Sequence, residues 1–471
     1  MRVTKYRRRN RLKLIFQGMI VLGLVVVALV GALQIKVVRE FFSEASGEPA
    51  NIKVSATKVV GVMPRPWRNL AQGGEDHAWR IQPITNQVRA LHPTYIRIDH
   101  IYDFYDIVGG SPGNLTFDFS KLDGLLDDIA AVGATPYISL SYMPPAISSG
   151  SIIDPPQNYA DWELVVQRTI DHISGARGTA NVYYEVWNEP DLFGGWKYYG
   201  DRNYITLYNA SARGAARATG VKPYKFGGAA TTALYKNWFD ALAKNAVNNR
   251  VRFDFFSWHR YDHSIDRYRD DMTEVRTWLK AYPTLEPSLE LHITEWGHDS
   301  ENHSGYDNNY GAAHTVAGAI EMVGVVERAF VFEIQDGKDP KGEKLWGRWG
   351  LLTHNDFGAT AKPRYNALKL LDKIGNQRLQ LLGKGSWVKA LAAKNNQGDI
   401  QIVLSNFDVY GKHTEAVPIT LTDMPSGSYT VTREFHNGQL QSTAASVSDG
   451  TLVTNVHLSP NTVVLVTIAK K

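Results

Sequence analysis

The chain of 471 residues contains no cysteine. Disulfide bonds, cysteine nucleophiles and cysteine-ligated metal centres are therefore excluded. We also find no internal repeat and no low-complexity segment, and 44% of the residues are hydrophobic while 21% are charged. This composition is typical of a folded protein with a sizeable core. The length exceeds one ordinary domain and is sufficient for a barrel of about 250 residues with a smaller second domain.

The chain lacks a strong excess of either charge once its N-terminus is set aside. The formal net charge is +4, and seven basic residues without any acid fall within the first thirteen positions, so the remainder carries 4 − 7 = −3. A slightly acidic remainder gives no support for a nucleic-acid surface. The seven basic residues are Arg2, Lys5, Arg7, Arg8, Arg9, Arg11 and Lys13.

One long apolar run follows this basic segment. Residues 14–36 are almost entirely apolar, and about twenty such residues in a helix span a hydrocarbon core of roughly 30 Å. A cleavable signal peptide has a shorter apolar stretch of about 7–15 residues. We therefore expect a transmembrane helix over 14–36, a cytoplasmic tail over 1–13 by the positive-inside rule, and a polar linker over 37–53. The rest of the chain would lie outside the cytoplasm, in the periplasm or at the cell surface.

Strand-like and helix-like segments then alternate. Eight β-rich runs separated by room for helices favour a parallel (β/α)₈ barrel, which we expect over residues 54–378. The sequence after the first run is Met63-Pro64-Arg65-Pro66-Trp67, which is not the glycine-rich turn of a doubly wound nucleotide-binding sheet. The predicted strands are 59–62, 95–98, 136–140, 182–187, 224–228, 253–258, 289–294 and 330–334. The predicted helices are 122–132, 159–174, 203–219, 238–245, 272–281 and 312–327.

The last part of the chain has a different pattern. Short alternating runs such as Ile400–Leu404, Ser428–Thr432 and Thr462–Val466 are separated by turn sequences such as Asn437-Gly438. This pattern predicts a β-sandwich, with the domain spanning residues 379–471. The fold class expected overall is thus α/β: a TIM barrel with a C-terminal β-sandwich and one N-terminal transmembrane helix.

Two predicted strands end in a carboxylate beside aromatic residues. The fourth ends Trp187-Asn188-Glu189-Pro190-Asp191, and the seventh ends Thr294-Glu295-Trp296. Barrel enzymes carry their working groups at the carboxyl ends of the strands. Glycoside hydrolysis requires one protonated and one ionised carboxyl group on either side of the scissile bond. Glu189 and Glu295 are therefore the candidate catalytic pair.

These two motifs together resemble clan A glycoside hydrolases, and Trp-Asn-Glu-Pro-Asp in particular resembles glycoside hydrolase family 39. The resemblance covers roughly residues 55–471. It implies that Glu189 is the acid/base and Glu295 the nucleophile. It also implies that Arg97 bonds to the nucleophile, that Asn188 binds the substrate 2-hydroxyl, and that His259 or Tyr261 contacts the nucleophile. A guanidinium beside Glu295 would keep it ionised, while aromatic cover would hold Glu189 protonated.

The chain departs from the family pattern after the second barrel strand. Family members often have Arg-x-His there, whereas this chain has Arg97-Ile98-Asp99-His100. This displacement leaves the roles of Asp99 and His100 open.

Aromatic residues are abundant in the predicted loops at the barrel mouth, where flat rings suit stacking against sugars. We expect Trp187, Trp296 and Trp349 to contact substrate, and about half of the other mouth aromatics to belong to the core. These others include Trp67, Tyr142, Trp196, Tyr198, Tyr199, Tyr306, Tyr310 and Trp346.

Other polar residues on the predicted strands favour structural roles. Glu185, Glu290 and Glu333 are interpreted as structural ion pairs. His259 and His263 have a spacing of four, but they follow a strand and do not share a helix, so we predict no metal site. No cofactor is expected.

The leading hypothesis is a retaining hydrolase that cleaves β-glycosidic bonds of a polysaccharide, acting within the polymer at the outer face of the membrane. The anchored arrangement is similar to that of glycosidases associated with exopolysaccharide production, so partners in the synthesis machinery are possible. Two alternatives stay open: a polysaccharide-binding scaffold of an export complex without activity, and a transglycosylase that uses the same residues.

Overall fold

The structure is a computed structural model that describes residues 47–74 and 76–471. The predicted tail (1–13), the predicted transmembrane helix (14–36) and most of the predicted linker (37–53) lie outside the described residues. Within the described part of the chain, no helix combines the length and apolar character needed to cross a membrane.

Eight parallel strands close into a barrel in the order β10-β11-β2-β3-β6-β7-β8-β9. Every neighbouring pair is parallel, because each connection returns through a loop or helix on the outside. The predicted (β/α)₈ architecture is confirmed. The strands are β2 (Asn69–Gln72), β3 (Tyr95–Ile98), β6 (Thr135–Leu140), β7 (Val182–Val186), β8 (Tyr224–Thr231), β9 (Phe255–Tyr261), β10 (Glu290–Gly297) and β11 (Arg328–Phe332).

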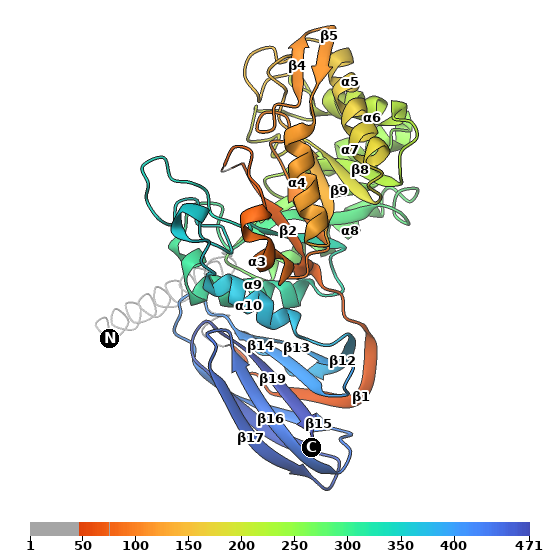
Figure 1. Ribbon diagram of the computed structural model, residues 1–471. Helices are drawn as coiled ribbons and strands as arrows, with labels where there is room; N and C mark the ends of the chain where they lie inside the picture. Colours follow the sequence, from red (N-terminus) through yellow and green to blue (C-terminus); the bar gives the residue numbers. More distant parts are fainter. Residues whose placement is uncertain (1–46, 75) are drawn as a thin grey trace, which may run out of the picture.

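Helices cover the outside of this barrel (Figure 1). The six predicted helices are present with shifted ends, and a short hairpin, β4 (Val108–Ser111) with β5 (Asn114–Phe117), follows β3. The helices are α3 (Thr85–Arg89), α4 (Ser120–Ala131), α5 (Tyr159–Ile170), α6 (Tyr204–Arg217), α7 (Lys236–Asn249), α8 (Arg267–Leu279), α9 (Asn309–Met322) and α10 (Pro363–Asp372).

The predicted first barrel strand is wrong. Residues 59–62 belong to β1 (Ile52–Val62), which pairs with strands of a second sheet, and the barrel begins with β2. Val59 and Val62 are 49% and 78% exposed, so their apolar character does not reflect burial in a barrel. The true strand is short, and its polar ends, Asn69 and Gln72, are buried through side-chain hydrogen bonds. A search for continuous apolar runs therefore passes over it.

The second sheet has nine strands in the order β17-β16-β19-β14-β13-β12-β1-β15-β18. It combines the C-terminal part of the chain with β1, which enters this sheet before the chain reaches the barrel (Figure 1). Its other strands are β12 (Gln377–Leu382), β13 (Val388–Lys394), β14 (Ile400–Asn406), β15 (Glu415–Thr422), β16 (Gly427–Phe435), β17 (Leu440–Val447), β18 (Leu452–Leu458) and β19 (Thr462–Lys470).

This sheet curls so that its two ends meet. Arg433 on β16 donates from Nε to the carbonyl oxygen of Asn455 on β18 at 2.9 Å, although these strands stand near opposite ends of the order. Ile419, Val431 and Val456 are buried between the two halves. The result has the two-layered core of the predicted β-sandwich.

One face of the curled sheet packs against the barrel through α9 and α10, which lie between the two bodies in Figure 1. Val403 and Leu465 belong to the same apolar core as the barrel helices. Ser405 Oγ donates to the carbonyl oxygen of Ala313 on α9 at 2.8 Å. The C-terminal sheet therefore supports the barrel directly.

Aromatic rings fill the barrel interior below its mouth. Tyr137 stacks on Tyr183 with ring centroids 5.2 Å apart and meets Phe330 edge-on at 4.7 Å. These rings are almost fully buried. The barrel is thus a packed core, and the space for a ligand lies above it, at the carboxyl ends of the strands.

Candidate active site

Glu189 stands in a tight turn directly after β7. Its backbone φ is +43°, in the left-handed region that residues other than glycine rarely adopt. Its amide donates to the carbonyl oxygen of Ala230 at 2.9 Å, and its own carbonyl oxygen accepts from the amide of Phe193 at 2.7 Å. The turn is therefore held from both sides, and it directs the carboxyl group into the barrel mouth.

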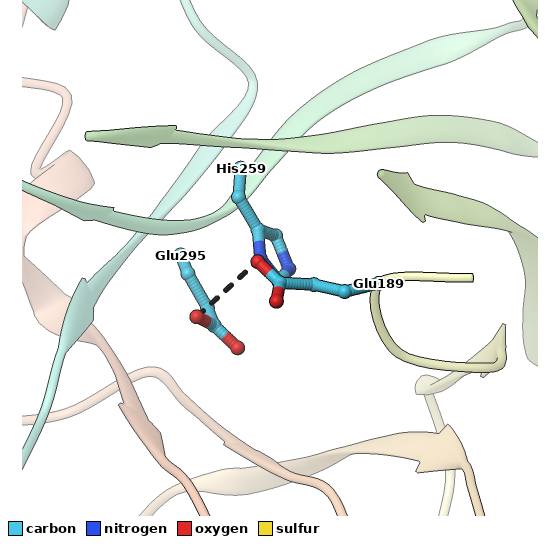
Figure 2. Close-up of side chains that lie close together, drawn as sticks. All are labelled: Glu189, His259 and Glu295. Carbon is cyan, nitrogen blue, oxygen red and sulfur yellow. Dashed lines mark hydrogen bonds and ion pairs between the residues drawn. The ribbon is translucent and has the colours of Figure 1, made fainter. Parts of the chain in front are cut away.

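Glu295 lies near the end of β10, paired in register with His259 on β9. It is 5% exposed, whereas Glu189 lies nearer the surface. Figure 2 shows the two carboxyl groups and the His259 ring converging on one space. One ligand atom from each of the three residues lies within 4.8 Å of the other two. The structure therefore brings the two predicted carboxylates together.

Arg97 on β3 organises the base of this site. The guanidinium is fully buried, and its three nitrogens donate to three acceptors at 2.8 Å each. Nη1 donates to Glu295 Oε1, Nη2 to Asn188 Oδ1 and Nε to Glu185 Oε2. A planar fork that bonds to two carboxylates and an amide fixes all three in place.

His259 and Tyr261 supply the donors on the other side of Glu295. Tyr261 donates its hydroxyl proton to Glu295 Oε2 at 2.8 Å. His259 Nδ1 lies 2.8 Å from Glu189 Oε1 and 3.4 Å from Glu295 Oε2, so the ring bridges the two carboxyl groups. Both oxygens of Glu295 thus face donors, as a carboxylate that carries negative charge requires.

Burial and the neighbouring cationic groups shift the pKa of Glu295 in opposite directions. Burial raises the pKa of Glu295, while the nearby His259 and Arg97 lower it and Glu189 raises it further. Arg97 therefore lowers the pKa of Glu295, as expected, but the effect of burial is larger and the pKa is raised overall. For His259, burial lowers the pKa, yet the two carboxylates outweigh that effect and raise it. The His259 ring is thus biased toward the protonated form between the two acids.

A cavity of about 600 Å³ opens over these groups. Of the predicted site residues, Asn188, Glu189, Tyr261, Glu295 and Trp349 line it. Arg97 and His259 are fully buried and lie outside the lining, so they act through the carboxylates and do not contact a ligand in the cavity.

The prediction that Trp187 and Trp296 contact substrate is corrected by the structure. Both are fully buried in the apolar core and neither lines the cavity. Successive residues of a strand point to opposite faces, so when Glu295 faces the barrel interior, Trp296 faces the surrounding helices. Trp296 meets Tyr268 of α8 edge-on with centroids 5.3 Å apart. Trp187 packs against Trp196, also edge-on, at 5.4 Å.

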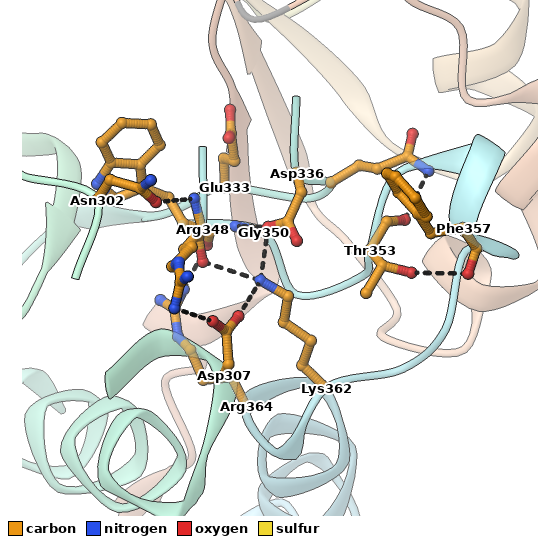
Figure 3. A network of polar contacts seen from close by, with 12 residues as sticks. Asn302, Asp307, Glu333, Asp336, Arg348, Gly350, Thr353, Phe357, Lys362 and Arg364 are labelled. Atoms are coloured by element: carbon orange, nitrogen blue, oxygen red, sulfur yellow. Dashed lines mark hydrogen bonds and ion pairs between the residues drawn. The ribbon is translucent and has the colours of Figure 1, made fainter. Parts of the chain in front are cut away.

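Arg348 and Gly350, the two sequence neighbours of Trp349, belong to a network of polar and ionic contacts with Asp336 and Lys362 (Figure 3). Lys362 Nζ lies 2.6 Å from Asp336 Oδ1, and it donates to the carbonyl oxygen of Arg348 at 2.9 Å. The amide of Gly350 donates to the same Asp336 oxygen at 2.9 Å. Burial raises the pKa of Asp336 to about 7, against the opposing effect of Lys362. Since Arg348 and Gly350 flank Trp349, the network fixes its place at the cavity wall.

Three residues of the site were missed or left open by the sequence. Glu185, interpreted as structural, bonds to Arg97 and so shares the cation with Glu295. Tyr142 accepts from Asn188 Nδ2 at 2.9 Å and lines the cavity. Asp99 also lines it, 5% exposed, with Oδ1 lacking a hydrogen-bond partner among the described residues. In the sequence, only the position of Asp99 directly after β3 pointed to a place in the site.

The spacing of Glu189, His259 and Glu295 would also allow metal ligation. The contacts of Glu295 disfavour it. The Arg97 guanidinium already sits 2.8 Å from one Glu295 oxygen, and Tyr261 donates to the other. A second cation at this carboxylate would be repelled by the first.

Comparison with known proteins agrees with this geometry. The family model described as glycosyl hydrolases family 39 matches residues 51–434. A β-xylosidase from Caldicellulosiruptor saccharolyticus is 26% identical over 330 residues, which cover 63% of this chain and 65% of that protein. A β-xylosidase from Geobacillus stearothermophilus is 26% identical, covering 62% of each. The chain thus spans somewhat less than two thirds of the length of these curated relatives.

Solved structures share the fold. A family 39 enzyme from Xanthomonas axonopodis pv. citri has a TM-score of 0.72 at 21% identity, covering 90% of this chain and 98% of that one. A monomeric β-xylosidase from Caulobacter crescentus has a TM-score of 0.73 at 22% identity, covering 89% and 99%. With the family model matching most of its length, this chain belongs to glycosyl hydrolases family 39.

Proposed function

We propose that the protein is a retaining glycoside hydrolase that cleaves β-glycosidic bonds. The observation that carries the proposal is the spacing of its acids: one carboxyl oxygen of Glu189 lies within 4.8 Å of one carboxyl oxygen of Glu295. Retaining enzymes hold their two carboxyl groups about 5–5.5 Å apart, whereas inverting enzymes need about 6.5–9.5 Å to admit a water molecule. The short spacing supports direct attack by one carboxylate.

The two acids are assigned roles by their contacts. Glu295 receives donors on both oxygens, from Arg97 and Tyr261, which favours the ionised form needed by a nucleophile. Glu189 stands at the tip of a turn, and among the described residues its carboxylate has one hydrogen-bond partner, the His259 ring. Because Glu189 also lines the cavity, we assign it the transfer of a proton to the leaving group.

The reaction proceeds in two displacements. In the first, Glu295 forms an ester bond to the anomeric carbon, the glycosidic C–O bond breaks, and Glu189 gives its proton to the departing oxygen. In the second, Glu189 takes a proton from water, the water oxygen bonds to the anomeric carbon, and the ester bond to Glu295 breaks. Arg97 and Tyr261 stabilise the charge that returns to Glu295 in this step.

For the substrate, we propose a β-linked polysaccharide, cleaved within the polymer and at the outer face of a membrane. The curated relatives are β-xylosidases, so β-xylosides are the first sugars to test. The apolar run 14–36 after a basic tail supports an anchored chain with its barrel outside the cytoplasm. An exopolysaccharide under synthesis is the polymer such an arrangement would meet.

The test uses the full chain, purified in detergent, with xylan, β-mannan, β-glucan and a native exopolysaccharide. Released oligosaccharides are analysed by mass spectrometry beside Glu189→Gln and Glu295→Gln variants. We expect products from one polymer, reduced by orders of magnitude in both variants. If no polymer or aryl β-glycoside is cleaved, while wild type and variants bind one polymer equally well, the protein is a binding scaffold and the proposal is wrong.

A further inference from the structure

A second hollow lies beside the catalytic cavity. Its volume is about 320 Å³, and it is formed by the loop between β7 and α6 together with the start of α7. It is separate from the groups that carry the chemistry. Its lining includes Asp191, Lys197, Tyr198, Tyr199, Asn237 and Trp238.

The two hollows are linked through one pair of residues. Thr232 lines the catalytic cavity and Asp191 lines the second hollow. The Thr232 amide donates to Asp191 Oδ1 at 3.0 Å, and its hydroxyl donates to Oδ2. Leu192 and Phe193, the next residues of the loop, are 60% and 39% exposed and line the catalytic cavity. The two hollows therefore adjoin each other along this loop.

The lining of the second hollow suits a sugar ring. Tyr199 is 55% exposed, so it does not serve as core packing. Tyr198 meets Tyr199 edge-on at 4.9 Å and the buried Trp238 at 6.1 Å, and Lys197 Nζ lies 5.8 Å from the Tyr199 ring. Aromatic rings offer flat apolar surface to the C–H faces of a sugar, while ammonium and amide groups bind its hydroxyls.

The loop that carries these residues is held in a defined shape. The Lys197 amide donates to the carbonyl oxygen of Arg202 at 2.9 Å, and the Tyr204 amide donates to the Lys197 carbonyl oxygen at 2.7 Å. Trp196 is buried beneath the loop. A surface already fixed before binding loses little conformational entropy when a ligand settles on it.

The position of the hollow decides which part of a substrate it meets. In the proposed reaction Glu189 donates its proton to the glycosidic oxygen, so the departing sugar lies on the Glu189 side of the scissile bond. The loop that builds the second hollow begins directly after Glu189. The departing part of a polymer would therefore extend toward Tyr199 and Lys197.

We infer that the hollow around Tyr198, Tyr199 and Trp238 is a leaving-group subsite that binds sugar units beyond the scissile bond of a β-linked oligosaccharide. The inference rests on the proposed function and extends it, because a subsite on this side of the bond favours substrates that continue as a sugar chain beyond the scissile bond over short glycosides. It also provides a place for an acceptor sugar in the second displacement.

The test compares a short and a long substrate of the same sugar. The short one is a p-nitrophenyl β-xyloside and the long one is xylohexaose, or the matching pair for whichever sugar the polymer panel identifies. Tyr199→Ala and Lys197→Ala are compared with Tyr410→Ala, which removes a similarly exposed tyrosine (62%) from the turn between β14 and β15. Lys197→Ala guards against a folding defect in Tyr199→Ala, and melting temperatures are measured for all three.

For Tyr199→Ala we expect kcat/KM on the hexasaccharide to fall about tenfold while the value on the aryl glycoside stays within twofold of wild type. The products should shift toward cleavage near the chain ends, and Tyr410→Ala should resemble wild type. Equal losses on both substrates, or no loss on either, would overturn the subsite. Absence of cleavage of both substrates by wild type would instead refute the proposed function, so the two failures are distinguishable.

Discussion

Removing the hydroxyl group of Tyr261 changes one hydrogen bond in the centre of the site and little else. In Tyr261→Phe the ring remains in place against Phe332, 6.2 Å away. The variant loses the bond of 2.8 Å from the hydroxyl to Glu295 Oε2. His259 Nδ1, 3.4 Å from that oxygen, is then the donor that remains beside it. The substitution therefore measures how much this one hydrogen bond to Glu295 contributes to the reaction rate.

The size of the effect follows from the charge on the acceptor. A hydrogen bond to a charged group contributes about 1.5–3 kcal/mol, and each 1.4 kcal/mol is a factor of ten in rate. We expect a loss of about 10- to 150-fold, mainly in the second displacement, where charge returns to Glu295. Slower turnover of the glycosyl-enzyme should appear as a burst of p-nitrophenol before the steady state.

The pH dependence of kcat/KM tests the same substitution in a second way. The Tyr261 hydroxyl stabilises ionised Glu295, so its removal raises the pKa of Glu295 still further above its ordinary value. Since Glu295 must be ionised to attack, the acidic limb of kcat/KM should move to higher pH. Tyr142→Phe is the matched control, because the Tyr142 hydroxyl meets the Asn188 amide and neither carboxylate. A Tyr261→Phe enzyme within threefold of wild type, with its acidic limb unmoved, would refute the reasoning.

Three further predictions concern four substitutions in and around the site. Arg97→Met leaves buried carboxylates without their cation and should destabilise the fold by about 3–5 kcal/mol, measured by denaturant unfolding, and an unchanged midpoint would contradict this. Trp349→Ala should weaken substrate binding with little change in melting temperature, whereas Trp296→Ala should cost about 3–5 kcal/mol of stability. Because burial raises the pKa of folded Glu295, its contribution to stability is complete below the unfolded value of about 4.5 and is lost as pH rises through the folded pKa. Glu295→Gln should therefore gain melting temperature over wild type as pH increases from 4.5 to 8, and a constant difference would argue against this.

The repeating part of the fold could be predicted from the sequence because buried parallel strands and amphipathic helices leave regular patterns. The runs at 95–98 and 182–187 became β3 and β7 almost unchanged. The first barrel strand could not be found in this way. Its four residues are buried, but two are polar: Asn69 bonds to the nearby Pro66 carbonyl oxygen, and Gln72 bonds to the distant Glu333 and Gln335. The valine-rich β1 competed with it and belongs to the other sheet.

Within the site, the sequence motifs identified the two carboxylates, but they did not show which other side chains face them. Trp296 directly follows Glu295 on β10 and points into the core, since strand neighbours face opposite ways. Trp187 lies in the turn after β7, two residues before Glu189, and is also buried in the core. Tyr142 reaches Asn188 from a separate loop, 46 residues away in sequence, a contact that depends on the closed barrel. Glu185 looked structural and indeed forms an ion pair, but its partner is the same Arg97 that holds Glu295.

The most direct test of the paired roles of Glu189 and Glu295 is the configuration of the first product. Hydrolysis of a p-nitrophenyl β-glycoside followed by proton NMR shows the anomer formed before mutarotation. We predict the β anomer first, and in Glu189→Ala with added azide a β-glycosyl azide, because azide then attacks the ester of Glu295 without needing a base. Release of the α anomer first would mean a single displacement by water, and it would contradict the assignment of Glu295 as nucleophile.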